Sequence, residues 1–331
     1  MQSGTRVYRK QIIEGVSIPA FIHNDSYFFT DLDVYEDGRV NCWNFEDFEH
    51  FKEDVRRGWV ALSIPDNKNI SIHGLGEWSI DNASWIFNRE SFIEYVTSLI
   101  RELNPHMENI FKYRQKVVKG TRVGELGTGL IYKPDNPKDI FPKRIEGNST
   151  NLFYRLKNEY YLVKVTVFAD LTVSLNRLEK PVALTLAELE ELVDKKIILT
   201  ELPQNARVCI YGLGSFDIGE CGYVVTIGEI LSQIKDMLRE LRGEPTSSHI
   251  CIQAYKNYVE NPTVENKEHL KISYENVPEH ERMYLGDMDT KDIPIRMIIY
   301  GEQEIENWSH YRVAKLQGKK LPEIRIPKPD Q

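Results

Sequence analysis

The densest group of side chains that could carry chemistry lies near the C-terminus. Residues 286–292 hold three carboxylates within six positions, those of Asp287, Asp289 and Asp292. Carboxylate oxygens are ligands that hard cations such as Ca²⁺ prefer. The EF-hand pattern is not completed, because the sixth position counted from Asp287 is Asp292 rather than glycine. The segment therefore predicts either a divalent-cation site or an Asp-rich turn that caps a helix beginning near Ile293.

A second polar group follows directly. Glu302, Glu304, Trp308 and His310 bring carboxylates, an indole and an imidazole close together, and such a set could act in general acid–base catalysis. The apolar side chains of the same stretch recur every three positions, which favours packing beneath a solvated helix face. The sequence assigns no catalytic role here. It predicts one candidate functional surface, made of Asp287, Asp289, Asp292, Glu302, Glu304, Trp308 and His310.

The remaining motifs argue against a metal, a cofactor or a nucleophile. The Gly-Leu-Gly at 74–76 and 212–214 could bring backbone N–H groups to a phosphate, but neither copy completes a nucleotide-binding motif, so a turn is favoured. His73 aligns with Tyr211, which predicts a packed aromatic position rather than a catalytic histidine. The four cysteines form no Cys-x-x-Cys pair and are predicted to be reduced, packed thiols.

The elements that must position these residues occur twice. His73 to Ile80 resembles Tyr211 to Ile218, 138 residues later, and the match continues without a gap to residues 103 and 241. Upstream, residues 27–40 match 160–173 with an offset of 133. The five-residue difference predicts an insertion after Val173, near residues 176–181, in a surface loop. The sequence therefore predicts two copies of one domain.

Each copy is predicted to contain a hairpin, a short helix, two further strands and a final helix. The first hairpin turns at Asp37-Gly38, and because the second copy has Asp170-Leu171 there, its turn is expected to differ. Asn88 and Thr226 are predicted N-caps of the final helices, and Asn261 of a later helix. The fold class is α+β: two tandem copies of a small antiparallel-sheet-plus-helices domain, then a helical C-terminal region. The expected bounds are copy one at 1–111, a linker at 112–147, copy two at 148–244, and at 245–331 the helical region with an extended tail.

The net charge and the apolar content of the chain limit the kinds of partner that it can bind. The 331 residues carry a formal charge of −8, which argues against nucleic acid as the main partner and favours a basic protein. No apolar run approaches the roughly 18 residues that a membrane span needs. No secretion signal is visible at the N-terminus. A cytoplasmic protein without membrane association is predicted.

Three segments resemble an uncharacterised bacterial family. They are residues 31–38, 73–76 and especially 286–296. Members of that family share the duplicated domain and the acidic C-terminal segment, so the resemblance covers nearly the whole chain. It implies a bacterial cytoplasmic protein, from the part of the genome where toxin-immunity and phage-defence genes gather.

Two functions remain open. The favoured hypothesis is a non-catalytic protein-binding module, for example for immunity-type binding of a basic toxin, because the duplication preserves no catalytic residue type: His73 and Glu77 become Tyr211 and Ser215. The alternative is a metal-dependent enzyme or phage-defence effector, in which Asp287, Asp289, Asp292 and residues 302–306 hold a divalent cation. The sequence does not define the oligomeric state.

Overall fold

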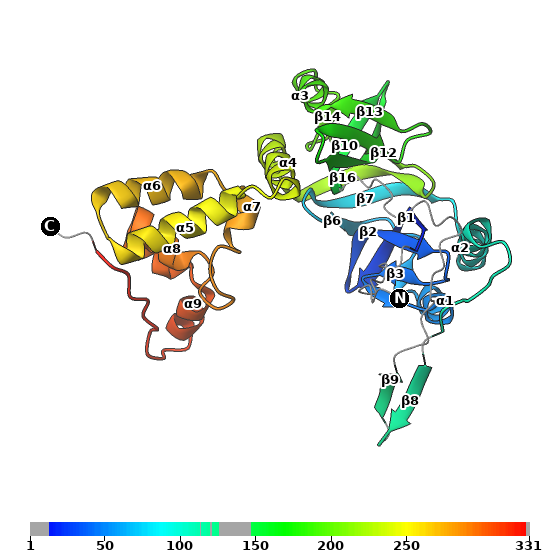
Figure 1. Cartoon of the computed structure of the whole chain (residues 1–331), viewed down its shortest axis with the longest axis horizontal. Helices are drawn as coiled ribbons and strands as arrows, with labels where there is room; N and C mark the ends of the chain where they lie inside the picture. The colour runs from blue at the N-terminus through cyan, green and yellow to red at the C-terminus, as the bar shows by residue number, and fades with distance from the viewer. Residues whose placement is uncertain (1–12, 113, 120, 126–146, 329–331) are drawn as a thin grey trace, which may run out of the picture.

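The computed structural model of the chain describes residues 13–112, 114–119, 121–125 and 147–328. A body built on a large mixed sheet lies on one side and a group of helices on the other, with helix α4 between them (Figure 1). The fold class is thus α+β. No helix in the described ranges combines the length and the apolar character that crossing a membrane requires.

The sheet body consists of two halves with the same order of elements. The first half holds β1 (Gly15–Asn24), β2 (Ser26–Tyr35), β3 (Val40–Cys42), β4 (Asn44–Glu46), α1 (Phe48–Arg57), β5 (Val60–Ala61), β6 (Lys68–Ile72), β7 (Gly76–Trp85) and α2 (Arg89–Leu103). The second half holds β10 (Gly147–Leu156), β11 (Glu159–Phe168), β12 (Thr172–Asn176), β13 (Val182–Thr185), α3 (Leu186–Asp194), β14 (Ile198–Leu199), β15 (Arg207–Ile210), β16 (Gly214–Val224) and α4 (Ile227–Leu241).

The prediction of an antiparallel sheet is wrong, because each half contains one parallel pair. Strand β2 runs parallel to β6, with Tyr27 opposite Ile70. Strand β11 runs parallel to β15 in the same register, with Tyr160 opposite Val208. In both halves the chain crosses over through a helix before the second strand of the pair, which is the connection that parallel strands need. The result is a mixed sheet.

The two halves share one sheet, because β7 and β16 pair with each other antiparallel. Ile80 lies opposite Ile218, and these are the residues that correspond at the offset of 138. The pairing makes a single sheet of fourteen described strands, whose main path is β13-β12-β11-β15-β16-β7-β6-β2-β1-β5. We call the β7–β16 pairing the seam.

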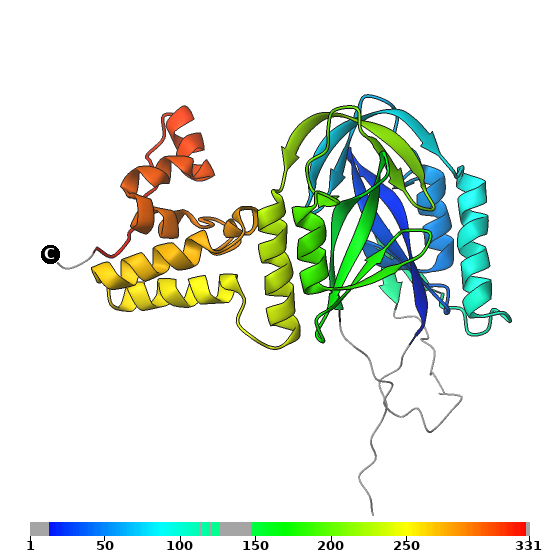
Figure 2. The ribbon, with the colours of Figure 1, turned by 90° about the horizontal axis from the view of Figure 1, so that it is seen from above.

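The sheet folds over so that its two halves face each other. Strands β2 and β11 are five positions apart in the strand order, so a flat sheet would separate them by about 24 Å. Instead, Asp31 on β2 and Lys164 on β11 form an ion pair at 2.9 Å, and the rings of Trp78 and Phe153 lie 5.4 Å apart. Helices α1 and α2 cover one outer side, and α3 and α4 the other (Figure 2).

The seam explains the repeated Gly-Leu-Gly motif. A Cβ atom on Gly76 would lie 2.6 Å from the backbone oxygen of Tyr223, and one on Gly214 would lie 2.4 Å from that of Ser84. Each second glycine therefore lets the strand of the opposite half approach. The prediction of a turn holds for Gly74 and Gly212, which both have positive φ.

The N-caps predicted for the final helix of each half are confirmed. Asn88 and Thr226 both form capping boxes with the residue three positions later. The prediction that the two hairpin turns differ is wrong: Gly38 has φ +79° and Leu171, its equivalent, has φ +70°. Both turns also close with a bond from this residue's N–H to the carbonyl three residues earlier. Leu171 thus adopts a left-handed conformation that costs a side-chain-bearing residue free energy.

The predicted insertion lies between β12 and β13. Five residues, 177–181, connect these strands, whereas only Trp43 connects β3 and β4 in the first half. Part of the predicted linker, 112–147, forms a hairpin of β8 (Arg114–Val118) and β9 (Thr121–Glu125). The Lys-Pro-rich stretch at 133–138 lies outside the described residues.

The C-terminal region is helical as predicted. It holds α5 (Ser247–Glu260), α6 (Val264–Glu275), α7 (Glu279–Arg282), α8 (Ile293–Tyr300), the 3₁₀ helix η1 (Glu302–Asn307) and α9 (Ser309–Leu316). The N-cap of α6 is Thr263 rather than Asn261, because the Thr263 side chain accepts from the Asn266 N–H. The extended tail returns to this core, where the Tyr258 hydroxyl donates to the Pro327 carbonyl at 3.0 Å.

We expect Gly214→Ala to break the seam. The new Cβ would overlap the Ser84 carbonyl, so the free energy of unfolding should fall by about 3 kcal/mol in urea denaturation. Gly228→Ala is the matched control, because no atom lies within 4 Å of its Cβ position. It should leave stability unchanged or raise it by up to about 1 kcal/mol. Equal stability of the two variants would contradict the close approach.

We expect exchange of the two turn residues to act in opposite directions. Leu171→Gly removes a strained φ and should stabilise the protein by about 1 kcal/mol. Gly38→Leu introduces the same strain and places a Cβ 3.0 Å from Ile110, so it should destabilise by about 2 kcal/mol. Thermal unfolding of both variants checks this, and a lower melting temperature for Leu171→Gly would show that the turn is not strained.

Candidate functional site

The seam forms the floor of an open pocket of about 370 Å³, which we call the seam pocket. Its wall comes from the connection between β14 and β15 and from the middle of β16. Apolar side chains and polar side chains share the lining. The residues are Trp78, Glu201, Leu202, Gln204, Ile218, Gly219, Glu220, Cys221 and Val224.

The pocket exists because β16 bulges away from β7. The register shifts between Ile218 and Cys221, so that β16 carries an extra residue there. A Cβ on Gly219 would lie 2.3 Å from the Ser79 hydroxyl oxygen, so glycine is what permits the bulge. The Glu220 N–H then donates to that hydroxyl at 2.7 Å. The bulge leaves the side chains of Glu220 and Cys221 exposed.

The lining combines an apolar floor with two acidic groups. Trp78 and Ile218 are each only 2% exposed and form the floor. Glu201 and Glu220 are exposed, and neither carboxylate has an ion-pair partner among the described residues. A group with a positive head and an apolar stem, such as a lysine or arginine side chain, matches this lining in charge and polarity.

The acidic groups belong to the second half alone. The residues of the first half that correspond to Glu201 and Glu220 are Ser63 and Asn82. Asp66, which corresponds to Gln204, instead accepts a hydrogen bond from the Ala83 N–H at 3.2 Å. Sequence reasoning missed the pocket, although the pattern Gly-Glu-Cys-Gly at 219–222 was a usable signal, because glycines inside a strand indicate a bulge.

Two predictions about burial are wrong at the seam and its turns. His73 is exposed and Tyr211 is 48% exposed, because both begin the turns that contain the Gly-Leu-Gly motifs. Cys221 is exposed on the bulge rather than packed, whereas Cys42 and Cys251 are buried. Partial desolvation and the Glu201 carboxylate raise the pKa of the Cys221 thiol. The thiol is therefore protonated at neutral pH and is a poor nucleophile.

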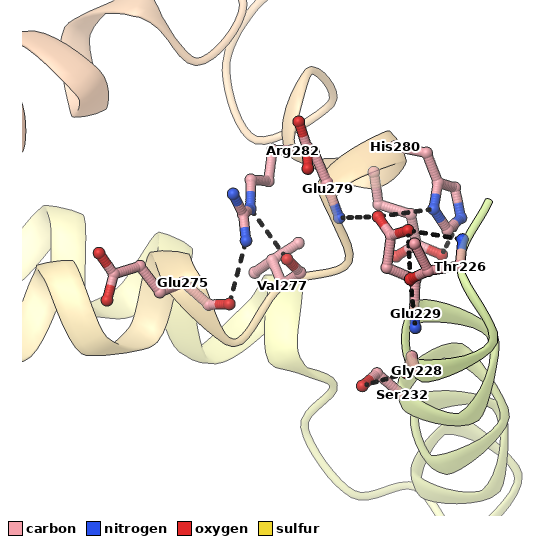
Figure 3. A network of polar contacts seen from close by, with 10 residues as sticks. Thr226, Gly228, Glu229, Ser232, Glu275, Val277, Glu279, His280 and Arg282 are labelled. Atoms are coloured by element: carbon pink, nitrogen blue, oxygen red, sulfur yellow. Dashed lines mark hydrogen bonds and ion pairs between the residues drawn. The ribbon is translucent and has the colours of Figure 1, made fainter. Parts of the chain in front are cut away.

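A second polar network joins the sheet body to the helical region (Figure 3). Glu229 receives the Thr226 N–H at 2.9 Å at the start of α4, and its other oxygen receives the Glu279 N–H of α7 at 3.1 Å. Burial alone would raise the pKa of Glu229, but these hydrogen bonds and the nearby His280 lower it below its ordinary value. One carboxylate thus connects two helix starts.

Asp236 makes a similar connection two turns further along α4. It accepts the Ser247 N–H at 2.9 Å, and also the Ser247 hydroxyl, at the start of α5. Residues seven apart lie on the same helix face, so Glu229 and Asp236 hold the helical region on one side of α4. We call the contacts of these two carboxylates the α4 junction.

In the open cavity at the α4 junction, about 350 Å³, the lining residues Glu229 and Arg282 already have partners. Arg282 donates to the Val277 and Glu275 carbonyls at 2.9 and 3.1 Å (Figure 3) and lies over the Tyr274 ring. His280 lies between carboxylates, 4.0 Å from Glu229 and 3.8 Å from Glu281. Burial raises the pKa of Glu281, and His280 opposes the shift. The residues around this cavity thus connect the sheet body, through α4, to the helical region, through α7.

The structure separates the acidic residues predicted near residue 290. Asp287 is exposed and accepts from the Asp289 N–H at 3.0 Å and the Thr290 N–H at 2.6 Å, and these hydrogen bonds lower its pKa. Asp292 is buried and accepts from the Tyr274 hydroxyl at 2.5 Å. Its side chain makes no capping bond to α8, so the capping predicted for this turn is wrong at Asp292.

The remaining predicted residues also have separate partners. Glu302 pairs with Lys328 at 2.6 Å, and Glu304 with Arg296 through a 2.8 Å hydrogen bond. The Trp308 indole donates to the Asp289 carbonyl at 2.8 Å, and its ring lies 5.3 Å from His310. Across the part of the chain that the structure describes, no group of three or more His, Cys, Asp or Glu side chains could hold a metal ion.

The fold and the seam pocket define a two-halved α+β protein with an appended helical region. Residues 3–107 and 135–245 match the family described as Domain of unknown function (DUF7638), and residues 246–324 match Domain of unknown function (DUF7639). The chain belongs to the DUF7638 family. No curated protein and no solved structure matches it. The resemblance to an uncharacterised family is confirmed, while the bacterial origin and the defence context stay predictions.

We expect Glu201 to slow alkylation of Cys221. Removing this negative charge by Glu201→Gln lowers the thiol pKa, so more thiolate forms and the rate with iodoacetamide at pH 7.5 should rise about twofold. A Cys209→Ser background leaves Cys221 as the exposed thiol, and mass spectrometry gives the rate. Glu265→Gln, on α6, is the control and should have no effect. An unchanged rate in Glu201→Gln would mean that this carboxylate does not act on the thiol.

Proposed function

We propose that the protein is a non-catalytic protein-binding module whose seam pocket receives a basic side chain of a partner protein. One observation carries the proposal: Glu201 and Glu220 stand without a described cation at the rim of a pocket whose floor is apolar. A lysine or arginine there would place its stem against Trp78 and its charge between the two carboxylates.

The chemistry of the pocket supports binding over catalysis. The one thiol in the lining, Cys221, has a raised pKa, which disfavours a nucleophilic role. A hydrogen bond to a charged group contributes about 1.5–3 kcal/mol, so two such contacts would form a useful anchor within a larger interface. The formal charge of −8 also favours encounter with a basic partner.

The proposal includes a history for the two halves. They are tandem copies of one domain, and the shared strand registers preserve the packing that both need. The seam registers show a bulge in β7 as well as in β16, so the second copy differs at this place by its acidic residues. A basic toxin bound by an immunity-type protein would be one partner of the required chemistry.

Photo-crosslinking from Cys221 tests the proposal. In a Cys209→Ser background, a thiol-linked benzophenone on Cys221 would sit at the rim of the seam pocket. Crosslinking in an extract of the native host should yield a partner peptide that contains lysine or arginine. Glu201→Gln with Glu220→Gln should lower the yield about tenfold, the loss expected from one charged contact.

The matched control removes two acidic residues elsewhere. Glu265→Gln with Glu268→Gln changes the net charge equally, on the exposed face of α6, and should leave the yield unchanged. A partner peptide without basic residues, or equal yields from both double variants, would refute binding of a basic side chain.

A further inference from the structure

The interface between the two halves carries opposite charges at equivalent positions. Asp31 on β2 corresponds to Lys164 on β11 at the offset of 133. Each lies on the second strand of its hairpin, opposite Pro19 and Asn151 respectively. The Lys164 ammonium lies 2.9 Å from the Asp31 carboxylate. Equivalent positions that contact each other lie close to the pseudo-two-fold axis, as Ile80 and Ile218 do.

A third charge comes from the insertion in the second half. Arg177 follows β12, its side chain is 8% exposed, and its guanidinium pairs with Asp31. It also donates to the Asn151 side chain at 2.8 Å and lies 4.7 Å from the centre of the Phe29 ring. Burial lowers the pKa of Arg177, and the Asp31 carboxylate opposes that shift. The insertion thus adds a second cation on the same side of the interface as Lys164.

From this geometry we infer that Asp31, Lys164 and Arg177 make the first half complementary to the second half and repulsive toward another first half. The partner that the inner face fits is therefore the opposite half, from the same chain or from a second copy. This inference is independent of the seam pocket and of its basic ligand.

The physical argument compares the alternative pairings. In a symmetric pair of first halves, Asp31 would face a second Asp31. In a symmetric pair of second halves, Lys164 would face a second Lys164, with two Arg177 side chains beside them. Unpaired like charges in a partly buried interface are strongly unfavourable, so both like pairings are disfavoured.

The seam strands alone do not provide this selection. Gly76 and Gly214 both keep the space that an approaching strand needs, and Ile80 faces Ile218, a residue of the same type. By these two criteria either strand edge could accept a copy of itself, and at the seam the halves differ only in side-chain contacts such as the hydrogen bond from Asn82 to Asp217 at 3.0 Å. The charges on β2, on β11 and after β12 distinguish the correct partner from the equivalent wrong one.

Three full-length variants test the inference. The first, Asp31→Lys, makes all three positions basic. The second, Lys164→Glu with Arg177→Glu, makes all three acidic. The third combines these changes, so that opposite charges face each other again with exchanged signs.

Each of the first two variants alone should melt about 5 °C below the wild type. The combined variant should recover more than half of that loss, although the contacts of Arg177 with Asn151 and Phe29 are lost. Mixed and refolded together, the first two should form a domain-swapped heterodimer, because each half then finds its opposite in the other chain.

Native mass spectrometry of the refolded mixture gives the decisive result. A heterodimer as the main folded species supports the inference, including the case in which neither variant folds alone. Two outcomes together would overturn it: no heterodimer in the mixture, and no recovery of melting temperature in the combined variant. Asp31→Asn is the neutral control, and it should lose stability without gaining affinity for the acidic variant.

Discussion

The structure depends on one contact, the backbone pairing of β7 with β16. This pairing joins the two halves into one sheet, and the fold of that sheet brings β2 and β11 face to face around a shared apolar core. The two glycines that permit it are the second residues of the repeated motifs. The same pairing also creates the seam pocket, because the register between β7 and β16 shifts at the bulge in β16. Architecture and candidate site therefore have a common origin.

The features that distinguish the halves lie in the second one. Its insertion supplies Arg177, and its bulge supplies Glu220 and Cys221. The first half has Asn82 where the second has Glu220, and it uses Asp66 to bind its own backbone. At these positions, where the two halves differ, recognition of a partner can arise while the fold that both halves share is kept.

Much of the fold was legible in the sequence, because it rests on local signals. The capping boxes at Asn88 and Thr226 and the offset of the insertion needed only neighbouring residues. The parallel pairs were missed, since their two strands lie far apart in the chain. The strands β1 and β10 were missed although each pairs with the strand that follows it. Leu171 defeated the turn prediction because the tight turn between β11 and β12 holds this residue in a left-handed conformation that leucine disfavours. The seam pocket was missed for a similar reason: Glu201 and Glu220 are nineteen residues apart, and only the bulge brings them together.

Helix α4 contacts both the sheet body and the helical region. Its apolar face packs into the core of the sheet body through Ile230, Ile234 and Leu238. On its polar face, Glu229 and Asp236 accept hydrogen bonds from the first turns of α7 and α5. In both contacts a backbone N–H donates to the carboxylate, so the hydrogen bonds fix direction as well as distance. The direction of α4 in the sheet body therefore sets where α5 and α7 begin, and with them the placement of the helical region.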